Sequence, residues 1–388
     1  MKRNLLIVHG GGPTAVLNAS LYGVITEAKK SDQIDKVYGA IGGTEAILNE
    51  NFLDLAETPE EELKLLLQTP GTAIGSSRFA VEQIHYEQMK DIFKRNNIKY
   101  VLFNGGNGTM DTCGKVYEVC KKEDIYTVGI PKTIDNDIAI IDHAPGYGSA
   151  ATFIANTTAE IGSDVKALPI HVTIIEAMGR NAGWITAASA LAKKTKQDAP
   201  HLVYLPERPF DEEEFLVDVK KLYDQLGGVV VVVSEGLKDK NGVSIVPPIF
   251  KTDRAVYYGD VSAHLANLVI KKLGIKARSE KPGLIGRTSM AHQSEVDRQE
   301  AIQVGREAVQ AALAGHSGVM VGIHRISNDP YSMETSFVPI SEVMLHEKKL
   351  PSHFINERGN HVTQSFIDWC SPLIGKSIPD FINFKEKI

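Results

Sequence analysis

Residues 100–131, YVLFNGGNGTMDTCGKVYEVCKKEDIYTVGIP, predict a strand, a glycine-rich turn, a helix and a second strand, and this unit decides the fold class. Tyr100–Phe103 and Tyr126–Ile130 are short runs of β-branched and aromatic residues, which predict strands. The pattern from about Gly108 to Cys120 predicts a helix between them. Strands that alternate with helices in this way are typical of a parallel sheet covered by helices on both faces.

The same alternation recurs along the chain. Further strands are predicted at Leu5–Val8, Val172–Ile175 and Val229–Val233. Helices are predicted after the first two, at Thr14–Lys29 and about Gly183–Ala192. The third strand is apolar throughout, which favours a central position in a sheet. For 388 residues, at roughly 150 per domain, we expect an α/β protein of two Rossmann-like domains. Each would hold a parallel sheet flanked by helices, with the active site in the cleft between the domains.

Composition excludes several classes of partner. The chain has 42 basic and 48 acidic residues and a net charge of −6, so it lacks the basic excess of a nucleic-acid-binding protein. Its three cysteines show no metal-type spacing, and its N-terminal apolar run is too short for a signal peptide. No apolar run is long enough to span a bilayer. We therefore expect a cytoplasmic protein without a membrane or nucleic-acid partner.

Two glycine-rich clusters follow predicted strands: His9–Thr14 (HGGGPT) and Asn104–Thr109 (NGGNGT). Glycine lets the backbone approach a phosphate closely, and the N-terminus of a following helix favours negative charge. The first cluster alone is equally consistent with a plain strand-to-helix turn, and that alternative is weaker for the second, because two such turns favour a polyphosphate held from two sides. Neither matches the Walker A pattern or the dinucleotide-binding GxGxxG pattern, so those folds lose support.

The segment Pro131–Asp137, PKTIDND, is the most specific of the chain. It follows a predicted strand and places two carboxylates, Asp135 and Asp137, beside a lysine and a hydroxyl. One carboxylate can take a proton from a hydroxyl nucleophile while the other serves a metal. The alternative is a capped turn, because Asp and Asn are common turn residues.

Arginines and a glutamate follow the later strands. Arg180 lies in the segment EAMGRNAG, and Arg278 and Arg287 flank Pro282–Gly283. An arginine at a strand end can hold phosphate oxygens in a bidentate manner, whereas a lone arginine is usually a solvated surface charge. Glu235, after VVVVVS, can bind a sugar hydroxyl. The set favours a sugar phosphate as ligand.

Together these segments resemble the phosphofructokinase family from about residue 4 to about residue 325. They occur in the family's order: GGGPTAVLNAS, GSSRF, GGNGT, PKTIDND, EAMGR, SEG and GLIGRTSMAHQSEVDR. The stretch PSHFINERGNHVTQSFIDWCSPLIGK is similar to tails of the longer, pyrophosphate-type branch. The resemblance implies a phosphoryl-donor domain, 1–143 plus about 288–318, and a fructose 6-phosphate domain, 144–287 plus about 319–388 with a C-terminal extension.

The resemblance also implies a role for each matching residue. Asp135 is expected to take the proton from the sugar 1-hydroxyl, with Thr133 beside it, and Arg78 and Arg180 are expected to neutralise the phosphoryl group in transfer. The residues expected to bind fructose 6-phosphate are Thr133, Asp137, Met178, Gly179, Arg180, Glu235, Arg278 and Arg287. The residues expected to bind the donor are Gly11, Gly12, Arg78, Gly106, Asn107, Gly108, Thr109 and Lys132. The residues expected to bind the Mg²⁺ cofactor are Asn107 and Asp137.

The resemblance leaves two donors open. Gly108 is glycine in ATP users, because a side chain there would collide with the nucleotide near its α-phosphate, and pyrophosphate users usually carry aspartate. Lys132 is lysine in pyrophosphate users and usually glycine in short ATP users, yet some longer-branch ATP users have both glycine and lysine. We favour ATP, and so a 6-phosphofructokinase forming fructose 1,6-bisphosphate, because room for the nucleotide is a steric necessity. The alternative is a pyrophosphate-dependent fructose 6-phosphate 1-phosphotransferase.

Two residues depart from the family pattern. Asn107 stands where ATP-dependent members have a magnesium-associated aspartate, which keeps a non-catalytic sugar-phosphate sensor as a remote alternative. His171 stands where short bacterial members have an arginine that reaches the neighbouring subunit's substrate. A dehydrogenase is disfavoured because GxGxxG is missing. The family implies a homodimer or homotetramer, and the sequence leaves allosteric effectors and other sugar phosphates open.

Overall fold

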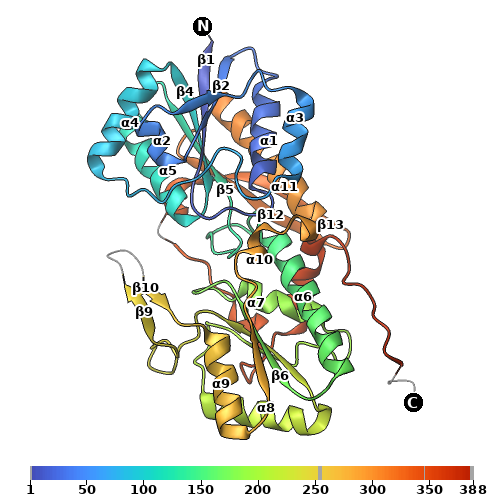
Figure 1. Cartoon of the computed structure of the whole chain (residues 1–388). Helices are drawn as coiled ribbons and strands as arrows, with labels where there is room; N and C mark the ends of the chain where they lie inside the picture. The colour runs from blue at the N-terminus through green and yellow to red at the C-terminus, as the bar shows by residue number, and fades with distance from the viewer. Residues whose placement is uncertain (1, 252–255, 345, 385–388) are drawn as a thin grey trace. The chain divides into compact units, whose positions relative to one another are not determined.

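The computed structural model describes residues 2–251, 256–344 and 346–384. The chain forms two compact units, the first from residues 1–149 and 287–348 and the second from residues 150–286 and 349–388 (Figure 1). The sequence-based division differs mainly at residues 144–149 and 319–348, which it assigned to the second domain. Residues 319–348 belong to the first unit because the strand beginning at Val319 pairs with the strand Tyr126–Pro131.

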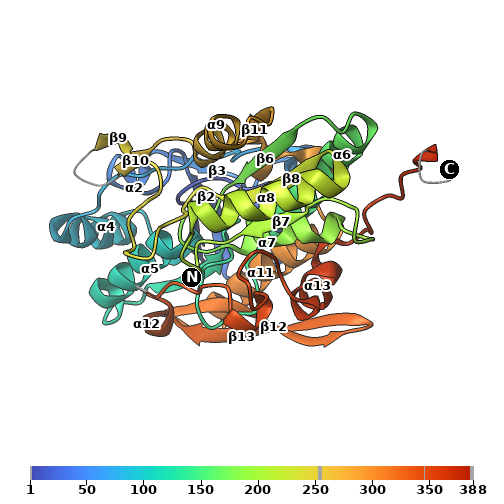
Figure 2. The same ribbon diagram turned by 90° about the horizontal axis from the view of Figure 1, so that it is seen from below.

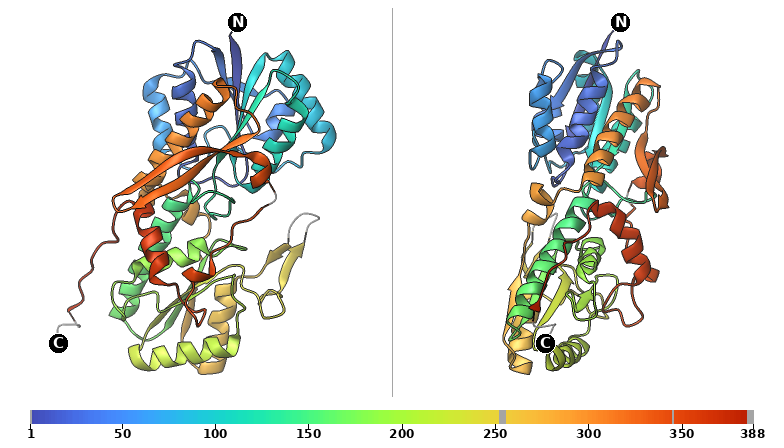
Figure 3. Two further views of the ribbon diagram at one scale, coloured as in Figure 1. Left: turned by 180° about the vertical axis from the view of Figure 1, so that it is seen from behind. Right: turned by 90° about the vertical axis from the view of Figure 1, so that its right-hand side faces the viewer.

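In the described part of the first unit, seven strands form one sheet in the order β13-β12-β5-β4-β1-β2-β3. Their bounds are β1 Arg3–His9, β2 Ile34–Ala40, β3 Phe52–Asp54, β4 Ile98–Gly105, β5 Tyr126–Pro131, β12 Val319–Asn328 and β13 Tyr331–Pro339. The pairs from β2 to β12 are parallel, and only the two outer pairs, β2–β3 and β12–β13, are antiparallel. Figure 3 shows β12 and β13 as a long hairpin at one end of the sheet.

Helices cover both faces of this sheet, as the alternation of side chains along β1 requires. Leu5 and Ile7 pack against α1 and α11, whereas Leu6 and Val8 pack against α4 and α5. The helices of this unit are α1 Leu17–Ala28, α2 Thr44–Leu48, α3 Glu60–Leu65, η1 Leu66–Gln68, α4 Gln83–Arg95, α5 Asn107–Cys120, η3 Met290–His292, α11 Glu295–Leu313 and α12 Ile340–Val343. Successive strand residues point to opposite faces, so both faces of a buried sheet must be apolar.

The second unit holds a smaller parallel sheet in the order β11-β6-β8-β7. Its strands are β6 Val172–Ala177, β7 Leu202–Tyr204, β8 Val229–Ser234 and β11 Ala277–Glu280, and a separate hairpin consists of β9 Pro248–Lys251 and β10 Val256–Tyr258. Every residue of β8 is buried, which confirms that the valine run is a central strand.

Helices flank the second sheet as well. The helices α8 and α9 pack through Phe215, Val219 and Leu265 against β6 and β8 (Figure 2), and α7 contacts the same sheet. The helices of this unit are α7 Trp184–Ala188, η2 Ser189–Ala192, α8 Glu212–Leu226, α9 Val261–Leu273, η4 Ser352–Phe354, α13 Gln364–Cys370 and η5 Ser371–Ile374. Two helices span the boundary between the units: α6 Tyr147–Ala167 and α10 Ile285–Thr288. Within the described ranges, no helix is long and apolar enough to cross a bilayer.

Candidate active site

The two predicted glycine clusters are neighbours at the carboxyl end of the first sheet. They follow β1 and β4, which lie side by side, and the Gly10 amide donates to the Asn104 carbonyl at 2.9 Å. The Thr109 side chain packs closely against both turns. A Cβ on either Gly10 or Gly105 would overlap its hydroxyl. Glycine is therefore required at these two positions for close packing of the turns.

A third segment, Gly75–Phe79, lies along the first turn. Ser77 forms a parallel bridge with Gly10, and the Ser76 hydroxyl donates to the Gly11 carbonyl at 2.7 Å. This pairing places Arg78, whose side chain is exposed, at the edge of the glycine turns. The structure thus brings together three of the segments on which the family resemblance rests.

Lys132 ties the end of β5 to the same turn. Its buried ammonium donates to the Gly10 carbonyl at 3.1 Å and to the Gly12 carbonyl at 2.5 Å. Burial, together with the charge of the nearby Arg287, lowers the pKa of Lys132 to about 8, although Asp135 acts in the opposite direction. A bound anion would stabilise the charged form of Lys132, because it would offset both the desolvation of the ammonium and the repulsion between the cations.

Arg287 joins this positive cluster. One of its terminal nitrogens lies 2.6 Å from the point where a Cβ on Gly12 would stand, and its buried Nε atom has no hydrogen-bond partner. Burial and the charge of Arg78 lower the pKa of Arg287. The sequence placed Arg287 with the sugar ligands, and the structure places it in the first unit beside the predicted donor residues. Its contact with a sugar stays a prediction.

The loop after β5 presents two carboxylates around a buried asparagine. Asn136 is fully buried with φ of 51°, and its side-chain oxygen accepts from the Ala144 amide at 3.0 Å. Asp135 and Asp137 on either side are only half-buried. The Thr133 hydroxyl accepts from the Asp135 amide at 3.1 Å. The loop is therefore anchored through Asn136, whereas the aspartates on either side of it are partly exposed.

The predicted metal ligands Asn107 and Asp137 are in direct contact. The Asn107 amide nitrogen donates to the Asp137 carboxylate at 2.9 Å, and the remaining side-chain oxygen of each residue is buried without a hydrogen-bond partner. Burial raises the pKa of Asp137. Unpaired carboxylate and amide oxygens are suitable ligands for Mg²⁺ or its bound water. Among the described residues, no cluster of three or more His, Cys, Asp or Glu is suited to a metal.

In the second unit, the segments EAMGR and SEG are adjacent because β6 pairs with β8. The Glu235 carboxylate accepts from the Gly179 amide at 3.3 Å, and the Ser234 hydroxyl donates to the Gly179 carbonyl at 2.8 Å. Burial raises the pKa of Glu235, while the charge of Arg180 opposes this. Met178 and Gly179 form the turn between these groups, so this part of the predicted sugar site is contiguous.

The two arginines predicted for the second unit lie in different places. Arg180 donates to the Val256 carbonyl at 3.0 Å, and its guanidinium lies 5.6 Å from the Tyr258 ring centre. Arg278 on β11 pairs with Thr173 near the start of β6, and its charge helps burial to lower the pKa of His171. Arg278 is thus associated with His171 rather than with the Gly179–Glu235 pair.

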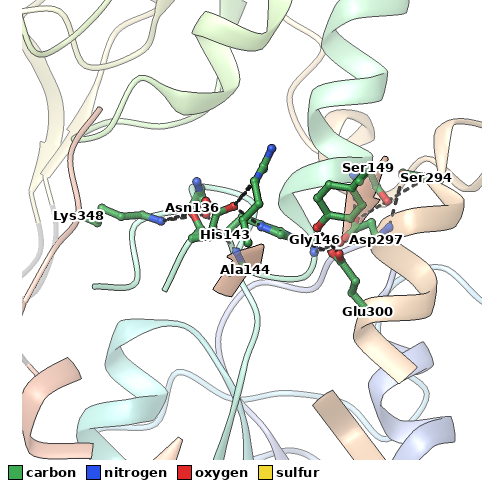
Figure 4. Close-up of polar contacts among 12 residues, drawn as sticks. Asn136, His143, Ala144, Gly146, Ser149, Ser294, Asp297, Glu300 and Lys348 are labelled. Atoms are coloured by element: carbon green, nitrogen blue, oxygen red, sulfur yellow. Dashed lines mark hydrogen bonds and ion pairs between the residues drawn. The ribbon is translucent and has the colours of Figure 1, made fainter. Parts of the chain in front are cut away.

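Sequence reasoning missed a buried polar network behind the loop that follows β5 (Figure 4). His143 contacts Asp142 and Glu300 through its two ring nitrogens, each at 2.7 Å. Burial alone would lower the pKa of His143, but these carboxylates raise it to about 9. Arg325 donates to Asp142 at 3.0 Å, and the Tyr331 hydroxyl donates to Glu300 at 2.5 Å. The network joins the loop to α11, β12 and β13.

Asp297 holds the other end of the loop. Its buried carboxylate accepts from the Gly146 and Ser149 amides, both at 2.8 Å, and so caps the N-terminus of α6. Burial raises the pKa of Asp297 to about 6. No local signal reveals either group, because Glu300 lies 157 positions from His143 and Asp297 lies 151 positions from Gly146 along the chain.

Comparison with known proteins agrees with this arrangement. The family model described as Phosphofructokinase matches residues 4–312. The chain belongs to the phosphofructokinase family. A protein of Rhodospirillum rubrum named pyrophosphate–fructose 6-phosphate 1-phosphotransferase is 37% identical, with 99% of this chain and 97% of that protein covered. A protein of the same name from Xanthomonas campestris pv. campestris is also 37% identical, with 97% of this chain and 92% of the relative covered.

A solved structure shows the same fold. The pyrophosphate-dependent phosphofructokinase from Marinobacter aquaeolei superimposes with a TM-score of 0.88 and is 36% identical, with 98% of this chain and 94% of that chain covered. The predicted α/β fold with parallel sheets and flanking helices is therefore confirmed. The cleft between the domains and the role of each phosphofructokinase site residue stay predictions.

Arg180 allows a direct test of one such role. We expect Arg180→Ala to lower turnover more than it raises the Michaelis constant for fructose 6-phosphate, because a charge that acts mainly in the transition state contributes little to ground-state binding. Steady-state kinetics of this variant and of Arg208→Ala, an arginine of the same unit outside the predicted site, measure the difference. An increase in the Michaelis constant alone would assign Arg180 to sugar binding.

Proposed function

We propose that this phosphofructokinase-family chain transfers a phosphoryl group from pyrophosphate to the 1-hydroxyl of fructose 6-phosphate, forming fructose 1,6-bisphosphate. The observation that carries the proposal is the buried Lys132 ammonium on the glycine turn, beside Arg287 and within reach of the charge of Arg78. Three cations around one turn suit a compact, highly charged donor. The names of the relatives point the same way.

This proposal corrects the expectation of ATP. That expectation rested on the space that Gly108 leaves, and the space exists, since a Cβ built on Gly108 meets no heavy atom within 4 Å. An open position permits a nucleotide without requiring one. Lys132, by contrast, makes specific contacts, and the full-length relatives at 37% identity carry pyrophosphate in their names. ATP therefore becomes the second donor to be tested.

Each part of the first unit has a role in the proposed reaction. Asp135, half-buried in the anchored loop, accepts the proton of the attacking hydroxyl. Arg78 and Lys132 neutralise charge on the phosphoryl group, which is the main requirement of phosphoryl transfer. Asn107 and Asp137 would hold Mg²⁺, which would supply further neutralisation of the donor when bound. The backbone amides of the two glycine turns complete the donor site.

In the second unit we propose that Glu235, Gly179 and Arg180 contact the sugar phosphate. Glu235 has one carboxylate oxygen on the Gly179 amide, and the second can accept from a sugar hydroxyl. We place the reaction in the cytoplasm, since the three cysteines are buried and free. A homodimer or homotetramer remains our expectation for the assembly.

The decisive experiment offers both donors to the purified protein. Fructose 6-phosphate and Mg²⁺ are incubated with either pyrophosphate or ATP, and fructose 1,6-bisphosphate is quantified. We expect turnover with pyrophosphate to exceed turnover with ATP by at least about tenfold, a difference of about 1.4 kcal/mol in the barrier. Exclusive use of ATP would refute the donor assignment, and no product with either donor would favour the sensor.

Gly108→Asp tests whether the open position matters to the donor. We expect any ATP-dependent turnover to fall by at least about tenfold, because the carboxylate would occupy the nucleotide path and repel its charge. Pyrophosphate-dependent turnover should stay within about twofold, since the shorter donor ends before that point. Thr112→Asp, one turn further along α5, adds the same charge as a control. If both donors respond alike to Gly108→Asp, the steric argument is wrong.

A further inference from the structure

A segment from the end of the first unit pairs with the loop after β5 that carries Asp135 and Asp137, called the catalytic loop below. Glu347 forms an antiparallel bridge with Ile138, and the Lys348 amide donates to the Asp137 carbonyl at 2.8 Å. Lys348 stands 212 positions after Asn136 and lies outside the family match at residues 4–312. Nothing in the motif-based reading assigned it a role.

The Lys348 side chain turns into the loop and meets three oxygens. Its ammonium donates to the Ile141 carbonyl at 2.9 Å, to the Asp142 carbonyl at 2.8 Å and to the Asn136 side chain at 3.4 Å (Figure 4). An ammonium has three N–H donors and no acceptor, so this ring of oxygens matches it. Burial lowers the pKa of Lys348 to about 8, although the Asp142 and Asp137 charges oppose this.

The oxygens that Lys348 contacts belong to the turn that carries the proposed chemistry. Asn136 separates Asp135 from Asp137 and is fully buried, so its position sets the direction of both carboxylates. Its side-chain oxygen receives the Ala144 amide from within the loop and the ammonium from outside it. Without the ammonium, two backbone carbonyls and this amide oxygen would lose a charged donor, which costs more than a neutral one.

We propose that Lys348 is a positioning residue for phosphoryl transfer: its ammonium fixes residues 136–142 so that Asp135 and Asp137 keep their orientation toward substrate and metal. Lys348 has no proposed contact with either substrate and acts through the loop. This inference rests on the proposed function. Misplacement of a reacting group by about 1 Å is enough to lower turnover by about 10²-fold.

The test compares two adjacent lysines. Lys348→Ala and the exposed Lys349→Ala are assayed for turnover per folded protein, for both Michaelis constants and for the Mg²⁺ concentration that gives half-maximal rate. We expect Lys348→Ala to lower turnover by about 10²-fold and to raise the Mg²⁺ requirement, with the constant for fructose 6-phosphate within about threefold. Added methylamine should restore part of the turnover in a saturable manner, because it can occupy the vacated ammonium position. Lys349→Ala should behave as the wild type.

Hydrogen exchange gives a readout that does not need activity. We expect faster amide exchange across residues 136–142 in Lys348→Ala than in Lys349→Ala, and Lys348→Met provides the same measurement if the alanine variant folds poorly. Equal turnover in the two alanine variants, or a loss that methylamine does not restore and that follows the folded fraction, would overturn the inference. If the wild type transfers no phosphoryl group, the proposed function fails, and the exchange data alone decide whether Lys348 holds the loop.

Discussion

Replacing Asp135 by asparagine is expected to lower turnover with pyrophosphate by about two to four orders of magnitude, the range that loss of a general base gives. Asparagine keeps the size of the side chain and removes its ability to accept the proton. Asp135 is half-buried on a loop whose neighbouring residue is anchored, so the substitution should leave the fold intact. Fructose 6-phosphate binding, measured by calorimetry, should remain within a few-fold of the wild type.

Two further variants make the Asp135 result specific. Asp91→Asn removes an exposed carboxylate on α4 and should have no effect. Asp137→Asn should lower turnover too, but high Mg²⁺ should restore part of it, because this carboxylate is the proposed metal ligand. Near-normal turnover of Asp135→Asn would show that another group takes the proton. If high Mg²⁺ restored the turnover of Asp135→Asn instead, Asp135 would be the metal ligand and Asp137 the general base.

Lys132→Met is expected to lower kcat/KM for pyrophosphate by about 10²- to 10³-fold, the usual effect of removing one group that stabilises transition-state charge. Methionine fills much of the space of the lysine stem, and the Gly10 and Gly12 carbonyls lose their shared donor. The Michaelis constant for fructose 6-phosphate should change little. Lys115→Met, an exposed lysine on α5, provides the control.

The pH dependence of the same variant checks the charge of Lys132. Its pKa of about 8 means that the ammonium is present below that pH and is lost as the pH rises through it. Affinity for pyrophosphate should therefore fall above about pH 8 in the wild type, and bound donor should shift this fall to higher pH. Burial, Arg287 and Arg78 lower the pKa of Lys132, whereas Asp135 and Asp137 raise it. If the affinity of Lys132→Met for pyrophosphate fell above about pH 8 in the same way as that of the wild type, the fall could not be assigned to Lys132.

Much of the fold was predictable because its signals are local. The strand Tyr126–Ile130 extends by one residue to Pro131, and the helix predicted from Gly108 begins at Asn107. The helix predicted from Thr14 begins only at Leu17, because the glycine turn continues through Pro13 and Thr14. The helix predicted at 183–192 consists of α7 followed by the 3-10 helix η2.

The site was predictable only in part. Segments that follow neighbouring parallel strands, such as the two glycine turns, could be expected to meet, since the carboxyl ends of parallel strands share one edge. Other parts of the site depend on contacts between distant parts of the chain. These are the positions of Arg287 beside Gly12, of His143 between two carboxylates and of Lys348 against the catalytic loop. Neither the periodicity nor the composition of a segment identifies a contact partner that is distant along the chain. The association of Arg278 with His171 is equally hidden, because it depends on the register between β11 and β6.

The pairing of β12 with β5 also constrains the order in which the two units can fold during synthesis. The first unit needs residues 287–348 for its sheet and for α11, whereas most of the second unit, residues 150–286, leaves the ribosome earlier. Domains generally fold as they emerge, and pairing between distant segments is slow because a long loop must close first. Lys348 is the last residue of the first unit to be made. A nascent chain that stops before Lys348 would carry Asp135 and the glycine turns but would lack this lysine, so the proposed geometry of the loop requires synthesis of the chain through residue 348.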